Sequence, residues 1–169
     1  MTTYHKIIGI DPGQSGAIIC ISNTGKLISL QDIPTITIRK GKKNKDTYDI
    51  VAIVKLLRSF TGIVYLEKTQ PMAAPVRAQA NYGLGFCSGM LEGILAALLI
   101  PYELIHPKTW HKYFNMTKAK GDYKKQAYMI VQKLFPTGEF TGPRGGIKDG
   151  RSDAALIAEW GRRHLQEGS

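Results

Sequence analysis

Residues 6–16 read KIIGIDPGQSG, an apolar run that ends on an acid and a Pro-Gly turn. The run predicts a buried strand over residues 6–11, and the β-branched residues of 16–22 predict a second strand directly after the turn. The turn residues 23–25, Asn-Thr-Gly, then lead into a third strand over 26–31. The chain is therefore expected to begin with a meander of three strands.

Helices and strands alternate in the remainder of the chain. Asp49 can cap a helix over 50–60, where apolar residues recur at helical spacing. The further expected elements are a buried strand over 62–67, an apolar helix over 83–100, a strand over 102–105, helices over 107–114 and 122–135, and a last helix over 150–166. Polar stretches at 39–45 and 137–148 are expected to be exposed loops. This order predicts an α/β fold with helices flanking a mixed sheet.

The length and charge of the chain limit the classes of protein to consider. Its 169 residues are the size of one compact domain, so we expect residues 1–169 to form a single domain rather than a two-domain enzyme. Lys and Arg number 23 against 13 Asp and Glu, which gives a formal net charge of +10. Such an excess of positive charge favours a polyanionic partner such as nucleic acid.

The basic residues gather in three polar segments, which indicates an extended surface for phosphate contacts. For each of these side chains the alternative is a solvated surface position with no partner, and it is their grouping that favours contact with DNA. The candidates are Arg39, Lys40, Lys42, Lys43, Lys45, Lys118, Lys120, Lys124, Lys125, Arg144, Lys148 and Arg151.

The two cysteines and the apolar segments bear on the compartment. Cys20 and Cys87 lie in apolar surroundings without a CxxC spacing, so both are expected to be buried thiols, with neither a disulfide nor a zinc site. The first residues lack the features of a signal peptide, which predicts a cytoplasmic protein.

Residues 83–100 are so apolar that a membrane-spanning helix has to be considered. Their glycines and Glu92 favour a core helix or a subunit interface instead.

Two acids end predicted strands. Asp11 stands directly before the tight turn, where rigid backbone would present it at the edge of the sheet, although a turn-capping role is the alternative. Glu67 ends the apolar run of residues 63–67, where an unpaired carboxylate is costly and needs a cation. Lys68 could supply that cation in a simple ion pair.

Two further acids, Asp149 and Asp153, lie one turn apart at the start of the last predicted helix, so their side chains can project to one side. The alternative is a helix cap plus a surface acid beside Arg151. A set of four carboxylates suits hard cations, and we expect two Mg²⁺ ions per site, with Mn²⁺ as a substitute. Such a pair of ions supports in-line cleavage of a phosphodiester that leaves a 5′-phosphate and a 3′-hydroxyl.

The turn after Asp11 leaves a second class open. Asp-Pro-Gly-Gln-Ser at 11–15 also resembles the phosphate loop of the actin-like and sugar-kinase superfamily, which indicates a phosphotransferase. That architecture needs two lobes, for which 169 residues leave little room. A third possibility is a nucleic-acid-binding module of the same fold without catalysis, or an RNA-processing relative. The presence of all four acids speaks against the non-catalytic module.

The ordered set of motifs is more specific than any one of them. The chain carries IGIDPGQSGAI at 8–18, IVYLEKT at 63–69, YGLGFCSGMLEG at 82–93, IHPKTW at 105–110 and KDGRSDAALIAEWGRR at 148–163. In this order it resembles the RuvC-type Holliday junction resolvases, in particular their phage-like and plastid-like branch. The resemblance covers most of the chain and implies a ribonuclease-H-like fold. It also implies a crossover junction endodeoxyribonuclease that uses Asp11, Glu67, Asp149 and Asp153.

The resemblance further implies a homodimer that nicks branched DNA symmetrically, with three-way and fork structures as further substrates beside Holliday junctions. The glycine-containing helix over 83–100 is the expected interface, and a phage-encoded member would act in the host-cell cytoplasm. Bacterial members space the last two acids three residues apart, whereas Asp149 and Asp153 are four apart. They also carry an aromatic residue shortly after the second acid, so Met72 or Tyr82 is expected to act as the junction wedge here.

Overall fold

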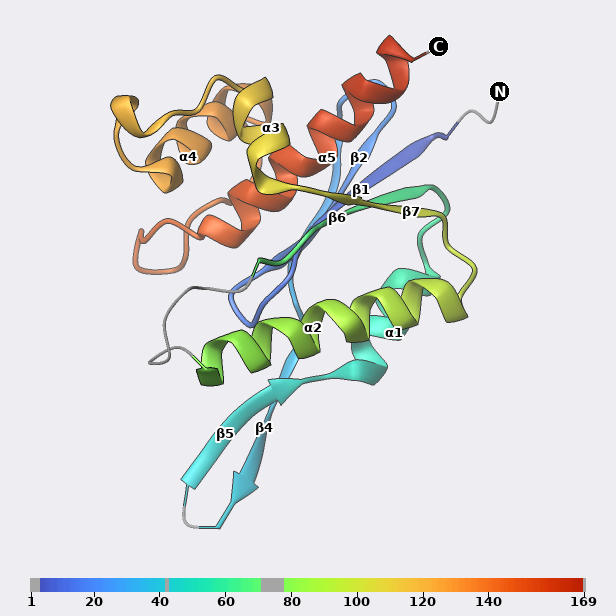
Figure 1. Cartoon of the computed structure of the whole chain (residues 1–169), viewed down its shortest axis with the longest axis vertical. Coiled ribbons are helices and arrows are strands. Elements are labelled where there is room, and N and C mark those ends of the chain that lie inside the picture. The colour runs from blue at the N-terminus through green and yellow to red at the C-terminus, as the bar shows by residue number, and fades with distance from the viewer. Residues whose placement is uncertain (1–3, 42, 71–77, 169) are drawn as a thin grey trace.

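A computed structural model of the chain describes residues 4–41, 43–70 and 78–168 (Figure 1). Its centre is a five-stranded mixed sheet in which β1 lies in the middle. β1 and β2 pair antiparallel, as do β2 and β3, while β6 pairs parallel with both β1 and β7. The order across the sheet is β3 (Leu27–Asp32), β2 (Ala17–Ser22), β1 (Lys6–Asp11), β6 (Ile63–Glu67) and β7 (Tyr102–Ile105).

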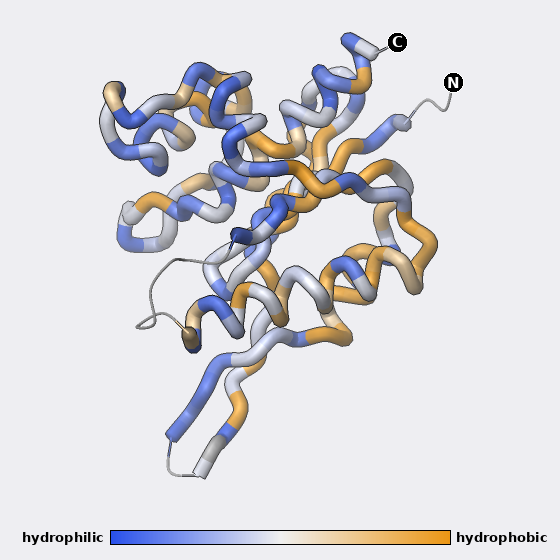
Figure 2. The backbone as a smooth tube through the Cα atoms, viewed as in Figure 1, coloured by the Kyte–Doolittle hydropathy of each residue, from blue (hydrophilic) through white to orange (hydrophobic). Residues whose placement is uncertain are grey.

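The alternation of side chains along the central strands creates two hydrophobic cores. Ile7 of β1 and Tyr65 of β6 belong to one core, whereas Ile8 and Val64, their neighbours in sequence, belong to the other. Successive strand residues point to opposite faces, so a strand that is apolar throughout must be covered on both sides. Figure 2 shows the resulting concentration of hydrophobic residues where the strands run between the helices.

Helices cover both faces of the sheet, as the order of elements predicts (Figure 1). One face packs against α1 (Ile50–Arg58) and α2 (Ala78–Ala97). The other face packs against α3 (Pro107–Tyr113), α4 (Tyr123–Leu134) and α5 (Asp149–Glu167), with a short 3-10 helix, Lys118–Lys120, before α4. The predicted cap is confirmed, because the Asp49 carboxylate accepts a hydrogen bond from the amide of Ala52 at 2.9 Å. Both cysteines are buried and free.

The expected loop over residues 39–45 is wrong. This segment belongs to a two-stranded antiparallel hairpin of β4 (Thr35–Lys40) and β5 (Lys43–Tyr48), which extends away from the main sheet (Figure 1). The alternation of Thr and Ile over 35–38 favours a strand, and this local β preference outweighs the basic residues that follow. Gly41 has a φ of +64°, as a tight turn between the strands requires.

The apolar segment over residues 83–100 was weighed above as a membrane helix, and the structure shows how it packs. Within the described ranges, none of the helices has both the length and the apolar character that crossing a bilayer requires. α2, which contains most of that segment, buries Cys87, Leu91 and Leu95 against the sheet. Its glycines Gly85 and Gly89 face open space instead, because a Cβ placed on either would meet no described atom within 4 Å other than its chain neighbours and the backbone of its own helix.

The closest packing in the fold is that of α5 on β1. A Cβ placed on Gly9 would clash with the carbonyl oxygen of Ala154 and the amide nitrogen of Ala158, both in the backbone of α5. Backbone cannot yield as the end of a flexible side chain can, so only glycine allows this approach. Gly9 therefore sets the depth at which α5 crosses the middle of the sheet.

We expect Gly9→Ala to lower the free energy of unfolding by about 3 kcal/mol, because the added methyl group must separate two backbones. Urea denaturation followed by circular dichroism measures the change. Ile7→Val, in the same strand and core, is the matched control and should cost only about 1 kcal/mol. Equal losses for the two variants would show that α5 does not depend on this close approach.

Candidate active site

Asp11 and Glu67 are the last residues of two neighbouring parallel strands. Ile10 is paired with Leu66, so the acids that follow stand side by side at one edge of the sheet. By the alternation of strand residues both acids share the face that carries Tyr65, which is the face that α5 covers. The sheet therefore presents the two carboxylates to the same helix.

α5 brings the other two acids to this edge. The helix begins at Asp149, one residue earlier than predicted, and Asp153 follows one turn later on the same side. Its second residue, Gly150, packs against the turn between β1 and β2, where a Cβ would clash with the Ser15 carbonyl and lie 3.0 Å from an oxygen of Asp11. The first turn of α5 is thus held directly over the end of β1.

The charges of these acids act on one another. Desolvation is the main cause that raises the pKa of Asp11 well above its usual value, and Asp153, Glu67 and Asp149 raise it further. Desolvation likewise raises the pKa of Asp153 to about 8, with added repulsion from Glu67 and Asp149. The pKa of Glu67 rises to about 7, again through desolvation. The structure therefore brings all four predicted acids into one electrostatic cluster.

The ion pair between Glu67 and Lys68, weighed as an alternative, is not among the ion pairs of the described residues. The Glu67 oxygen Oε2 instead accepts a hydrogen bond of 2.8 Å from the indole nitrogen Nε1 of Trp110, in α3. This hydrogen bond opposes the rise in the pKa of Glu67. Sequence reasoning assigned Trp110 no role, because the two residues are 43 positions apart and no spacing rule connects them.

Lys124 supplies positive charge at the site. Its Nζ lies 2.6 Å from an oxygen of Asp149, and its charge lowers the pKa of Asp11 and Asp153. The ion pair in turn raises the pKa of Lys124. Lys124 is one of the predicted DNA contacts, and in this DNA-free structure it pairs with an acid of the cluster.

Two more of the predicted DNA contacts, Arg151 and Lys148, form ion pairs within the protein. The Arg151 guanidinium donates two hydrogen bonds to Asp32 at the end of β3, from Nε to Oδ1 at 2.5 Å and from Nη2 to Oδ2 at 3.1 Å. Lys148 Nζ lies 3.3 Å from Oδ2 of the same carboxylate. The Arg151 hydrogen bond is the main reason why the pKa of Asp32 is lowered. Asp32 was not singled out from the sequence. Its partners tie the start of α5 to the edge of the sheet.

The remaining basic candidates are spread over two surfaces. Arg39, Lys43 and Lys45 lie exposed on the hairpin, and Lys40 lies there too, although its side chain is outside the described part. Lys42 is also outside the described residues. The second surface consists of exposed side chains near α4 and in the loop before α5: Lys118, Lys120, Lys125 and Arg144.

The donor set fits a divalent cation. Four carboxylates provide hard oxygen ligands, and their burial beside one another leaves negative charge that a cation would compensate. In the described ranges no three His, Cys, Asp or Glu side chains are already arranged as a metal centre.

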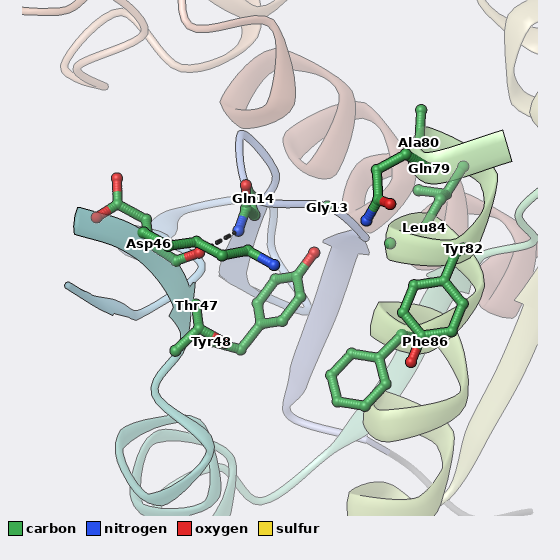
Figure 3. A pocket seen from close by; sticks show the side chains of 12 residues that line it. Gly13, Gln14, Asp46, Thr47, Tyr48, Gln79, Ala80, Tyr82, Leu84 and Phe86 are labelled. Atoms are coloured by element: carbon green, nitrogen blue, oxygen red, sulfur yellow. Dashed lines mark hydrogen bonds between the residues drawn. The ribbon is translucent and has the colours of Figure 1, made fainter. Parts of the chain in front are cut away.

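A cavity of about 830 Å³ opens on the other side of the turn that follows Asp11 (Figure 3). Gly13 and Gln14 of that turn, strand β5 and the first half of α2 line it, whereas none of the four acids does. Tyr48 and Phe86 stack there with ring centroids 6.1 Å apart, and Tyr82 on the rim is 70% exposed. Met72, the other wedge candidate, lies outside the described residues.

Comparison with known proteins gives a consistent result at the level of the fold. The chain matches no protein-family model and no curated protein sequence. Among solved structures, RuvC of Thermus thermophilus in complex with a Holliday junction substrate is similar with a TM-score of 0.66 at 13% identity, over 98% of this chain and 97% of that chain.

Two further solved structures have a similar fold. A second structure of Thermus thermophilus RuvC gives a TM-score of 0.58 at 14% identity over 96% of both chains. The yeast mitochondrial Holliday junction resolvase gives a TM-score of 0.53 at 20% identity, over 95% of this chain and 79% of that chain. The ribonuclease-H-like expectation is confirmed, and the chain has the fold of the RuvC-type Holliday junction resolvases.

Proposed function

We propose that this protein is a divalent-metal-dependent endonuclease that cuts branched DNA. The observation that carries the proposal is the convergence of Asp11, Glu67, Asp149 and Asp153 at the end of β1, where each of the other three raises the pKa of Asp11. The fold, shared with proteins whose structures are described as junction resolvases, supports the choice of substrate.

The four acids would hold two Mg²⁺ or Mn²⁺ ions. Such ions, when bound, generate the attacking hydroxide from water and stabilise the leaving 3′ oxygen, so that the products carry a 5′-phosphate and a 3′-hydroxyl. The task of the protein is to keep the ligands on rigid elements, two strand ends and one helix start. Lys124 neutralises Asp149 in the resting protein and would be released toward the DNA phosphates when that acid takes a cation.

The DNA would lie across the exposed basic residues of the hairpin and of the region around α4. Each lysine or arginine that neutralises a phosphate releases counterions, which supports binding without sequence readout. Lys148 and Arg151 are less available for this purpose, because both already pair with Asp32. We therefore reassign these two residues from DNA contact to the anchoring of α5.

Dimerisation would place two active sites on one junction. A four-way junction has two-fold symmetry, and a symmetric pair of subunits can cut it at matching positions. The outward face of α2 is the proposed interface, since Gly85, Gly89 and Gly93 recur every four residues on that face and leave room for close approach.

Tyr82 would stack on a base at the branch point. It projects from the first half of α2 at the rim of the cavity beside the turn that follows Asp11 (Figure 3). Lys45 of β5 also lines this cavity. Exposed aromatic rings beside positive charge are platforms for unpaired bases. A base in this position would bring the strand next to the acid cluster.

The test of the function is a cleavage panel of four-way, three-way, flap and duplex DNA with matching RNA. We expect symmetric nicks in four-way junctions in Mg²⁺ and none in EDTA, with linear duplex left intact. Asp11→Asn should bind the junction as the wild type does and cut it no faster than background, because a ligand of the cation is lost. Glu103→Gln, which changes an exposed acid on β7, is the control.

Full cleavage by Asp11→Asn would reject the assignment of the site. Specific binding of ATP together with no cleavage of any substrate would instead favour the phosphotransferase alternative.

We expect Tyr82→Ala to weaken binding of a four-way junction by about tenfold while binding of linear duplex stays unchanged, because the loss of one stacked base costs about 1–3 kcal/mol. Fluorescence anisotropy with labelled DNA measures both affinities, and size-exclusion chromatography checks that the subunit state is unaltered. Tyr82→Phe keeps the ring and should behave as the wild type. A parallel loss on junction and duplex would contradict stacking at the branch point.

A further inference from the structure

We propose that Trp110 is a positioning residue for the metal site, which fixes the orientation of the Glu67 carboxylate by donating its indole N–H to one of the two oxygens. This inference rests on the proposed function, because it assigns Glu67 to the cation. Trp110 itself touches neither the cation nor the DNA and acts only through Glu67.

The geometry of the contact supports this role. Trp110 is 1% exposed, so its indole N–H has no access to water and requires an acceptor inside the protein. Among the described residues, its acceptor is Glu67 Oε2 at 2.8 Å, the length of a strong bond to a charged acceptor. The partly buried Glu67 carboxylate thus has a fixed partner, and rotation about the Cγ–Cδ bond of Glu67 would break this hydrogen bond.

The indole is itself held in place by a row of rings. His111 meets Trp110 edge to face with centroids 4.0 Å apart, and Tyr123 stacks on His111 at 4.6 Å and 12°. Tyr123 opens α4, and the next residue, Lys124, pairs with Asp149. The α3 and α4 region therefore supports two acids of the cluster, Glu67 through Trp110 and Asp149 through Lys124.

The contact leaves Glu67 able to bind a cation. An indole has a single N–H, so Trp110 donates to only one of the two carboxylate oxygens, Oε2. Each carboxylate oxygen has two lone pairs, so one accepted hydrogen bond does not prevent coordination. Trp110 would thus set the orientation of Glu67 before the cation arrives without blocking the ligand.

The test is Mn²⁺ binding to the DNA-free protein, measured from the electron paramagnetic resonance signal of unbound Mn²⁺. Trp110→Phe keeps a large aromatic ring and removes the donor, so we expect Mn²⁺ affinity to fall by about tenfold or more. The matched control is Trp160→Phe, which changes the other tryptophan, packed against Tyr65 and His164. This control should bind Mn²⁺ as the wild type does.

A cleavage assay separates positioning from packing. If Trp110 positions Glu67, the Mg²⁺ concentration at half-maximal rate rises for Trp110→Phe while the rate at saturating Mg²⁺ recovers most of its wild-type value. A purely structural role would lower the melting temperature and the maximal rate and leave the Mg²⁺ dependence unchanged, which would overturn the proposal.

Trp160→Phe provides a second measurement that does not need the Trp110 variant to fold, since Trp110 is then the sole tryptophan. Added Mn²⁺ should quench its emission, and Glu67→Gln should shift that emission and abolish the quenching. Unaltered emission in both experiments would contradict the contact.

The behaviour of the wild type distinguishes failure of the proposed function from failure of the role of Trp110. A wild type that neither binds Mn²⁺ nor cuts DNA rejects the proposed function and this inference with it. A wild type that does both, beside a Trp110→Phe protein with the same Mn²⁺ affinity, rejects only the role of Trp110.

Discussion

The close approach of α5 to β1 is the constraint on which the rest of the structure depends. Gly9 lets the helix backbone rest on the middle of the strand, and Gly150 lets its first turn rest against the turn after Asp11. Both contacts involve backbone, so a side chain at either position would lift the helix. Because Asp149 and Asp153 lie on that first turn, the same packing that builds the core also sets the separation of the four acids.

The four acids of the cluster repel one another, so the stabilising contacts come from the basic residues around them. Desolvation and then repulsion raise the pKa values of Asp11 and Asp153, and the charge of Lys124 partly opposes this rise. Arg151 and Lys148 hold the start of α5 through Asp32, outside the cluster. A site with buried acids on rigid elements is suited to a divalent cation.

Most of the fold, and the four acids that the structure brings together, could be predicted from the sequence, because both depend on local patterns. Apolar runs fixed the strands around Asp11 and Glu67, and the order of motifs indicated the fold that the structural comparisons confirm. The hairpin was missed since its alternating Thr and Ile residues lie beside a conspicuous run of charge. The contacts of Trp110 and Asp32 could not be predicted, because they join residues 43 and more than 100 positions apart.

The most direct test of the central claim is calorimetric titration of the DNA-free protein with Mg²⁺ in buffers of different ionisation enthalpy. The pKa of Glu67 is raised to about 7 and that of Asp153 to about 8, so both carry protons near pH 6 and lose them by pH 9. A cation must displace those protons, so the account predicts an affinity that rises between about pH 6 and pH 9, with proton release that declines over the same range. An affinity independent of pH, without proton release, would contradict a cation held by these acids.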